Sequence, residues 1–258
     1  MKVPGLFEKY KTLIISLFLF LLNFIIKIIG ISENDIANDE PFSIFYAQMD
    51  VRSIFKMLAT ENNPALHFVL LHYWIKIFGL GAFSVRFISL LFSSLTVVVI
   101  FLTGKKFFSA YTGLFSSLIY TASYFHIYFS HEARVYPIFV FFTSLSLFLF
   151  MSIIDKPEKK KNYIWLFITN ALLIYSHYFG FFVIVTEIFC VFIIPQSRKI
   201  LIRFAFVILA LLITYIPNII IFINRISVSI MHGTWLKKPE WSELYGNINR
   251  FLNSKFTT

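Results

Sequence analysis

The segment YFSHEARVYPIF, residues 128–139, places His131, Glu132 and Arg134 between two long apolar runs. Ionisable residues inside or beside membrane spans are rare, and a functional role is the default hypothesis for them. Glu132 and Arg134 are two residues apart at a predicted helix–turn junction, and His131 and Tyr136 flank them. The alternative interpretation is a mutual salt bridge that closes the turn. We favour a functional role for this group.

A second charged group is the carboxylate pair Asp39-Glu40, which ends the stretch SENDIANDE. A carboxylate at an interface can serve as a general base, because partial burial and a neighbouring like charge raise its pKa. The pair fits equally well a solvated acidic loop that Pro41 ends. Arg86, at the end of another apolar run, is either a snorkelling anchor or a clamp for a phosphate group. Taken alone, its position favours the anchor.

Two further polar positions lie in the later apolar runs. His177-Tyr178 lies at the end of one run, where aromatic side chains commonly anchor a helix at the membrane interface. Glu187 lies near the middle of the following run. We expect it to face the interior of a helical bundle beside a polar partner, or to be protonated. The sequence does not identify that partner.

The histidines do not have the spacing of metal ligands. His67 and His72 are five residues apart, which places them on different faces of a helix. The single cysteine, Cys190, lies in an apolar run and can form neither a disulfide framework nor a cysteine-based metal site. We therefore predict no histidine-based metal site, and a divalent cation bound by the carboxylates of Asp39 or Glu40 stays open.

The sequence also contains no Gly-rich phosphate loop and no Walker pattern. The energy for any reaction must then come from a substrate that was activated elsewhere. For a site at a membrane surface, a lipid-linked phosphate ester is a natural candidate. Such a donor needs an apolar groove for its tail, cations for its phosphate and a base for the acceptor hydroxyl.

Long apolar runs must position these residues. The 258 residues are 58% hydrophobic and 14% charged, whereas soluble domains carry about 25% charged residues. The net charge of +10 comes mostly from basic residues in short loops between apolar runs, which is typical of membrane orientation and does not favour nucleic-acid binding. The first run is too long for the core of a cleaved signal peptide, so we predict a retained helix.

We predict an all-α polytopic membrane bundle with a single domain and seven spans. A basic amino terminus and three basic loops then share the cytoplasmic side, and the first outer loop faces the other side together with the His131–Tyr136 turn. The segment 63–79, NPALHFVLLHYWIKIFG, is predicted to be an amphipathic helix in the outer interface, and a short true span is the alternative. The predicted spans are roughly 12–31, 85–104, 110–129, 136–154, 163–178, 179–195 and 200–222, with an outer loop at 32–84.

The order of these motifs resembles the GT-C superfamily of integral-membrane glycosyltransferases, in the branch with the dolichyl-phosphate-mannose protein mannosyltransferases and the bacterial aminoarabinose transferase. The similarity covers nearly the whole chain. Its specificity lies in an ordered series: an acidic pair, Asn-Pro-x-Leu, Phe-Gly, Arg-Phe-x-Ser and Glu-Ala-Arg-x-Tyr. The matching elements are NDEPFS, then NNPALHFVLLHYWIKIFGLGAFSVRFISLLFSSLTVVVIFLTGKKFF, SHEARVYPIFVFFTSLSLFLF, YSHYFGFFVIVTEIF and TWLKKP.

This resemblance implies an inverting transferase that moves a sugar from a polyprenyl monophosphate carrier to a hydroxyl of a protein, glycolipid or polysaccharide. It implies that Asp39 is the catalytic carboxylate, with Glu40 beside it. It further implies that Arg86 and Arg134 hold the lipid phosphate, and that Glu132 orients Arg134 or binds the acceptor. The other positions that it places in substrate binding are His67, His131, Tyr136, His177 and Tyr178.

The resemblance also implies an integral protein of the cytoplasmic membrane with its active face on the non-cytoplasmic side. Members of the superfamily usually have further spans after the seventh, so we expect that this chain lacks a carboxyl-terminal part. One alternative is a non-catalytic membrane component of a surface-polysaccharide system, such as a lipid-carrier transporter or an assembly subunit, and another is an inactive truncated transferase.

Overall fold

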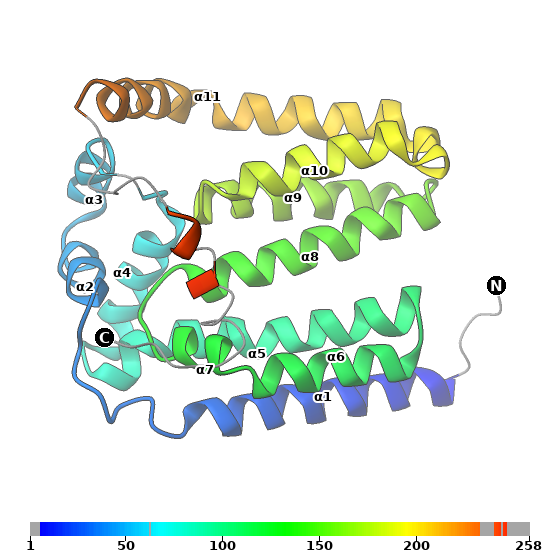
Figure 1. Ribbon diagram of the computed structural model, residues 1–258, viewed down its shortest axis with the longest axis horizontal. Coiled ribbons are helices and arrows are strands. Elements are labelled where there is room, and N and C mark those ends of the chain that lie inside the picture. Colours follow the sequence, from blue (N-terminus) through cyan, green and yellow to red (C-terminus); the bar gives the residue numbers. More distant parts are fainter. Residues whose placement is uncertain (1–5, 62, 233–239, 244, 247–258) are drawn as a thin grey trace.

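The computed structural model describes residues 6–61, 63–232, 240–243 and 245–246, with the backbone alone at 6, 220, 222 and 224–232. The regular structure of these residues is helical, so the predicted all-α fold is confirmed. Most of the long helices lie side by side along one axis (Figure 1). They are α1 (Leu6–Ile28), α5 (Ala82–Phe107), α6 (Ala110–Ala122), α8 (Tyr136–Asp155), α9 (Lys160–Ser176), α10 (Gly180–Ile193) and α11 (Leu201–His232), with the 3-10 helix η1 (Pro195–Ile200) before α11.

Among the described residues, four helical segments are long and apolar enough to cross a membrane: Phe7–Ile28, Ala82–Phe107, Tyr136–Asp155 and Pro195–Ile219. The described helices α6, α9 and α10 have 13, 17 and 14 residues, which is shorter than the roughly 20 residues of a typical span. The count of seven spans therefore stays a prediction.

The predicted span at roughly 110–129 is not one helix, because the chain forms two helices there. α6 ends at Ala122, and α7 (Tyr124–Ser130) starts after Ser123, whose backbone is extended with ψ 117°. Serine competes poorly as a helix former, because its hydroxyl bonds to nearby backbone groups. The break lets α7 pack against α5, α6 and α8.

The outer loop contains three short helices that gather at one end of the bundle (Figure 1). They are α2 (Glu40–Ala47), α3 (Val51–Leu58) and α4 (Leu66–Phe78). α4 has 13 residues and is therefore about 20 Å long at 1.5 Å per residue, short of the roughly 30 Å hydrocarbon core. It buries His67, Phe68, Leu71 and His72 and leaves Tyr73 and Ile77 exposed, so its geometry favours the interfacial interpretation over a true span.

α5 lies at the centre of the bundle and packs against α1, α4, α6, α7 and α8. Its contact with α6 is very close: a Cβ added to Gly104 would lie 2.4 Å from the Cα of Gly113. Only glycine permits this approach, so the pair fixes how α5 and α6 cross. The loops α5–α6, α8–α9 and α10–α11 lie at the end opposite α2–α4 (Figure 1).

Glu187 has two polar partners inside the bundle. Its side chain accepts hydrogen bonds from Ser146 Oγ at 2.6 Å and from Asn170 Nδ2 at 2.9 Å. The three residues belong to α10, α8 and α9 and are buried. Glu187 therefore faces the bundle interior, as its position in an apolar run indicates. The TWLKKP stretch, residues 234–239, lies outside the described residues.

Candidate active site

The acidic loop and the turn between α7 and α8 meet at the end of the bundle that carries α2–α4. Arg134 Nη2 lies 3.1 Å from Asp39 Oδ2, and Arg134 Nη1 donates to the Asp39 carbonyl at 3.2 Å and to Ser43 Oγ at 3.3 Å. The Asp39 side chain is 71% exposed, whereas that of Arg134 is 12% exposed. A buried cation thus holds an exposed carboxylate.

Asp39 occupies the N-cap position of α2, where a carboxylate usually accepts a hydrogen bond from the first turn of the helix. It makes no such side-chain bond. Asp50, in contrast, caps α3 by accepting a hydrogen bond from Ser53 N. The Asp39 carboxylate is therefore free to accept a proton or bind a substrate group beside Arg134.

Glu40 is adjacent in sequence but faces the interior. It forms a bidentate ion pair with Arg86, through Nε to Oε1 at 2.8 Å and Nη2 to Oε2 at 2.7 Å. The remaining N–H groups of Arg86 donate to three carbonyl oxygens of the preceding loop, those of Ile31, Asn34 and Asp35. All five donors of this guanidinium therefore have protein acceptors. The geometry makes Arg86 the organiser of the loop that leads to Asp39, and it leaves no N–H for a phosphate.

A divalent cation does not fit at Glu40. Oε1 also accepts from Ala133 N at 2.8 Å and Oε2 from Ala37 N at 3.3 Å. With the Arg86 bonds, the roughly four lone-pair positions of this carboxylate are occupied. Within the described part of the chain, no group of three or more His, Cys, Asp or Glu side chains has the arrangement of a metal site.

Glu132 lies beside the exposed pair and is nearly buried. Asn38, whose φ of +54° is in the left-handed region that asparagine tolerates, donates to Glu132 Oε1 at 3.4 Å and to Tyr128 Oη at 3.2 Å. Burial raises the pKa of Glu132, and hydrogen bonds from Tyr128 and Asn38 oppose that shift. Glu132 therefore fixes the residue that precedes Asp39.

The turn itself is held at its central peptide. Ala133 N donates to Glu40, and the Ala133 carbonyl accepts from His67 Nε2 at 3.0 Å. This bond assigns the proton of His67 to Nε2, and Nδ1 is buried without a hydrogen-bond partner among the described residues. Burial, and secondly the charge of Arg134, lower the pKa of His67 to about 4. His67 is therefore neutral at neutral pH.

A cavity of about 10 Å³ lies between His67 and Arg134, lined also by Ser43, Pro64 and Ser176. Arg134 Nε, like His67 Nδ1, is buried and has no partner among the described residues. Arg134 thus keeps a donor in addition to those that contact Asp39 and Ser43. This donor distinguishes it from Arg86.

Three more of the predicted residues surround Arg134 or its turn. The Arg134 guanidinium lies 5.7 Å from the centre of the Tyr136 ring, within the range of a cation–π contact. The rings of Tyr136 and His177 are 6.2 Å apart. Burial and the charge of Arg134 lower the pKa of His177. His131 Nε2 donates to the Lys27 carbonyl at 2.7 Å, which ties the turn to α1.

Tyr178 belongs to a neighbouring pocket. It lies there with Phe55 and Asn63 from the outer loop and with Tyr175 and Tyr215 from α9 and α11. The structure thus brings together nine of the ten predicted residues, directly or through the Ala133 peptide and its turn. It places Tyr178 beside them.

Lys27, Asn38 and Ser43 were not predicted from the sequence. Lys27 is fully buried, donates to Ser93 Oγ at 2.9 Å and lies 4.4 Å from the centre of the Tyr120 ring. A lysine inside an apolar run was the available signal, but near the end of a span it resembles an ordinary anchor. Asn38 and Ser43 carry no comparable signal.

Next to this site, a cavity of about 270 Å³ is lined mainly by aromatic side chains, among them Phe125, Phe129, Tyr136 and Phe139. An apolar helical bundle, an exposed carboxylate on a buried guanidinium and an adjoining apolar cavity agree with the GT-C superfamily of membrane proteins. The family described as dolichyl-phosphate-mannose-protein mannosyltransferase matches residues 62–221, and the chain belongs to this family.

A solved structure shows the same fold. The crystal structure of ArnT from Cupriavidus metallidurans in the apo state superposes with a TM-score of 0.67 and 15% sequence identity. The match covers 92% of this chain and 48% of that one, so this chain spans about half the length of that protein. No match was found among curated proteins. The fold and the apolar helices identify an integral membrane protein.

Proposed function

We propose that this chain transfers a sugar from a polyprenyl-phosphate carrier to an acceptor hydroxyl at the non-cytoplasmic surface of the cytoplasmic membrane. One observation carries the proposal: an exposed carboxylate, Asp39, lies 3.1 Å from the guanidinium of Arg134 at the mouth of an apolar bundle. The carboxylate is suited to take a proton, and the guanidinium is suited to bind a phosphate. Membership of a glycosyltransferase family supports the reaction class.

In the proposed reaction, Asp39 removes the proton of the acceptor hydroxyl. The hydroxyl oxygen bonds to the anomeric carbon from the face opposite the phosphate, and the carbon–oxygen bond to the phosphate breaks. The electron pair leaves with the phosphate oxygen, so the configuration inverts. Alignment of acceptor, anomeric carbon and leaving group lowers the barrier further.

Arg134 stabilises the charge that develops on the departing phosphate. It contacts both Asp39 and the apolar cavity, the latter through Tyr136, and it keeps an unpaired Nε donor. A fixed cation in a site of low dielectric contributes a few kcal/mol to such a step, by analogy with an oxyanion donor. The cavity beside Tyr136 would hold the first apolar part of the carrier.

The other residues position this pair. Glu40 and Arg86 hold the loop, Glu132 holds Asn38, and His67 and His131 hold the turn. His177 lines the site beside Tyr136. Contact of Tyr178 with substrate is proposed on the resemblance alone, since its pocket adjoins the site and does not include Arg134.

The test compares Asp39→Asn with Glu33→Gln, which removes another exposed carboxylate from the same loop. Proteoliposomes would receive a polyprenyl-phosphate sugar and an acceptor panel, and release of polyprenyl phosphate would be measured. We expect a loss of about 10²–10⁴-fold for Asp39→Asn, as for removal of a general base, and little change for Glu33→Gln. Transfer that persists in Asp39→Asn would remove Asp39 from the mechanism. Carrier movement across the bilayer without any transfer by the wild type would favour the non-catalytic alternative.

A further inference from the structure

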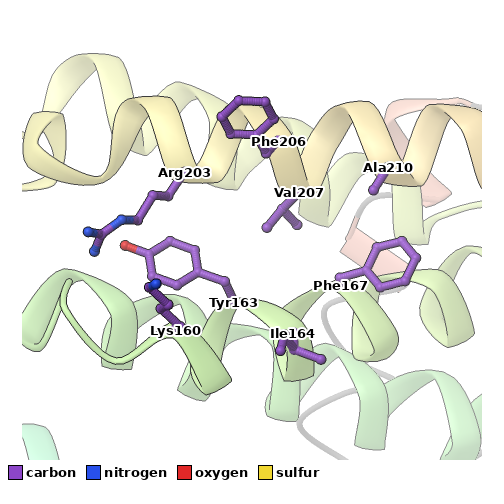
Figure 2. A pocket seen from close by; sticks show the side chains of 8 residues that line it. All are labelled: Lys160, Tyr163, Ile164, Phe167, Arg203, Phe206, Val207 and Ala210. Carbon is purple, nitrogen blue, oxygen red and sulfur yellow. The ribbon is translucent and has the colours of Figure 1, made fainter.

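A larger cavity lies far from the candidate active site, between α9 and α11 near the loop that joins α8 to α9. Its volume is about 370 Å³, and eight residues line it: Lys160, Tyr163, Ile164, Phe167, Arg203, Phe206, Val207 and Ala210. Figure 2 shows Lys160, Tyr163 and Arg203 gathered at one end of the groove and Ala210 and Phe167 further along it. The groove is therefore polar and cationic at one end and apolar beyond it.

We propose that this groove binds an anionic glycerophospholipid of the cytoplasmic leaflet. The headgroup phosphate would lie between Lys160 and Arg203, and the start of an acyl chain would follow Val207, Ala210 and Phe167. This assignment does not depend on the proposed transferase reaction.

The cations at the mouth are available for a ligand. Lys160 and Arg203 are both exposed, and Lys160 makes no hydrogen bond or ion pair with the described residues. Arg203 Nη1 donates to the Pro157 carbonyl, to which Tyr163 Oη also donates at 3.1 Å. Arg203 also forms a side-chain hydrogen bond with the Tyr163 hydroxyl, and the two contacts hold the guanidinium at the mouth of the groove. Lys160 is also the first residue of α9, so the positive end of that helix adds to the field.

The apolar part of the groove has the length and direction required for the start of an acyl chain. From Lys160 to Phe167 and from Arg203 to Ala210 each wall runs seven residues, about 10 Å at 1.5 Å per residue. Both walls lead from the loop end toward the middle of the bundle. Phe206 and Ile164 are 67% and 60% exposed, so the groove opens sideways to the hydrocarbon. A free phosphate would use the cations and leave this apolar surface uncovered.

The charge of this end of the molecule favours an anionic lipid. The loop beside the groove contains Lys156 and Lys159, and Lys161 follows in the first turn of α9; the acidic residues there are Asp155 and Glu158. The positive-inside rule assigns this end to the cytoplasm, and the cytoplasmic leaflet carries the anionic headgroups. Basic pockets between membrane helices on that side are known to bind such headgroups.

The test measures lipid binding by the purified protein in detergent, using native mass spectrometry with phosphatidylglycerol and, as the neutral comparison, phosphatidylcholine. The variant Lys160→Gln/Arg203→Gln removes both cations of the mouth. Arg198→Gln/Lys199→Gln is the matched control, since it removes two exposed cations from η1 at the same end. Ala210→Trp fills the apolar part and keeps both charges.

We expect the wild type to retain phosphatidylglycerol in preference to phosphatidylcholine. The first variant should weaken phosphatidylglycerol binding roughly tenfold or more, from about 1 kcal/mol per basic residue near the surface, and the control should not. Ala210→Trp should weaken it as well. Arg203→Lys, which keeps the charge, should retain binding and shows whether any loss comes from a disturbed loop.

Three results would overturn the proposal. Equal binding of the two lipids by the wild type would show that the cations do not read the headgroup. Equal losses in the two double variants would show a general surface charge in place of a defined site. Binding that is unchanged in Ala210→Trp would show that the tail does not occupy the groove, for example because another protein segment covers it.

Discussion

The buried pair Glu40–Arg86 leads to the sharpest prediction about stability. Both side chains are 3% exposed, and their charges compensate each other through two hydrogen bonds of 2.8 and 2.7 Å. Removing one partner leaves the other charge buried and unpaired, which costs about 3–5 kcal/mol in proteins. We therefore expect Glu40→Gln and Arg86→Met each to lose that amount.

The double variant Glu40→Gln/Arg86→Met should lose clearly less than the sum of the single variants, because neither buried charge then remains. The interaction energy of such a cycle is expected at about 2–3 kcal/mol. Of the three carbonyl oxygens that Arg86 releases, those of Asn34 and Asp35 can then bind water, because these residues are exposed. The carbonyl of Ile31 is buried, so its release is part of the cost in every variant that lacks Arg86.

The assay is thermal unfolding in lipid nanodiscs, followed by intrinsic fluorescence. A loss of 3–5 kcal/mol corresponds to a decrease in Tm of roughly 10 °C for a chain of this size. Arg52→Met is the control, since Arg52 lies exposed on α3 and surface substitutions change stability by about 0.5 kcal/mol or less. If Arg86→Met has the same Tm as Arg52→Met, or if the double variant loses as much stability as the two single variants together, the ion pair does not hold the loop as described.

Three other expectations follow from the packing of the bundle. The pKa of His67 is lowered from 6.5 to about 4, so the folded state resists its protonation; the stability that neutral His67 confers is full above pH 6.5 and is lost as the pH falls toward 4. This protonation lowers the free energy of unfolding by about 3 kcal/mol between pH 7 and 4. The difference in unfolding free energy between the wild type and His67→Phe should therefore shrink by that amount over this pH range. A difference that stays constant would contradict a neutral, buried His67. Glu187→Gln should leave the stability in thermal unfolding nearly unchanged. Glu187→Leu leaves Asn170 without its acceptor and should lower the stability by about 1–3 kcal/mol. A larger loss in Glu187→Gln than in Glu187→Leu would show that the carboxylate charge itself is required. Gly113→Ala should destabilise the protein by several kcal/mol, because its Cβ would lie 2.5 Å from the Phe101 carbonyl oxygen. Gly246→Ala, whose Cβ meets no atom of the described residues within 4 Å, is the control, and an equal loss in it would contradict the close approach of α5 and α6.

The all-helical membrane fold could be predicted from the sequence because its signal is local. An apolar run of about 20 residues and basic loops at one end need no knowledge of distant contacts. The break at Ser123 was missed for the same reason: residues 110–129 contain no proline and no Asp, Glu, Lys or Arg, and the two helices separate where α7 packs against three other helices. Hydropathy does not record that packing.

The candidate site was predictable in its residues but not in their pairing. Sequence reasoning treated Asp39 and Glu40 as one carboxylate pair and Arg86 and Arg134 as one pair of phosphate ligands. The structure couples Asp39 with Arg134 and Glu40 with Arg86. Asp39 and Arg134 are 95 positions apart in the sequence, and Glu40 and Arg86 are 46 positions apart. Helix α2 begins between the two acids, and this local geometry turns Glu40 to the interior and leaves Asp39 outside.

The different roles of Glu40 and Asp39 explain how the flexible side chain of Arg134 can be positioned accurately. An arginine side chain has many rotamers, and ordering it costs up to about 2 kcal/mol. Here the backbone of Arg134 follows Ala133, whose N–H is held by Glu40 and whose carbonyl is held by His67. The far end of the side chain is held by Asp39 and Ser43. The buried acid thus fixes the base of Arg134 and the exposed acid fixes its tip, so a change at Glu40 should disturb Arg134 although the two side chains share no hydrogen bond.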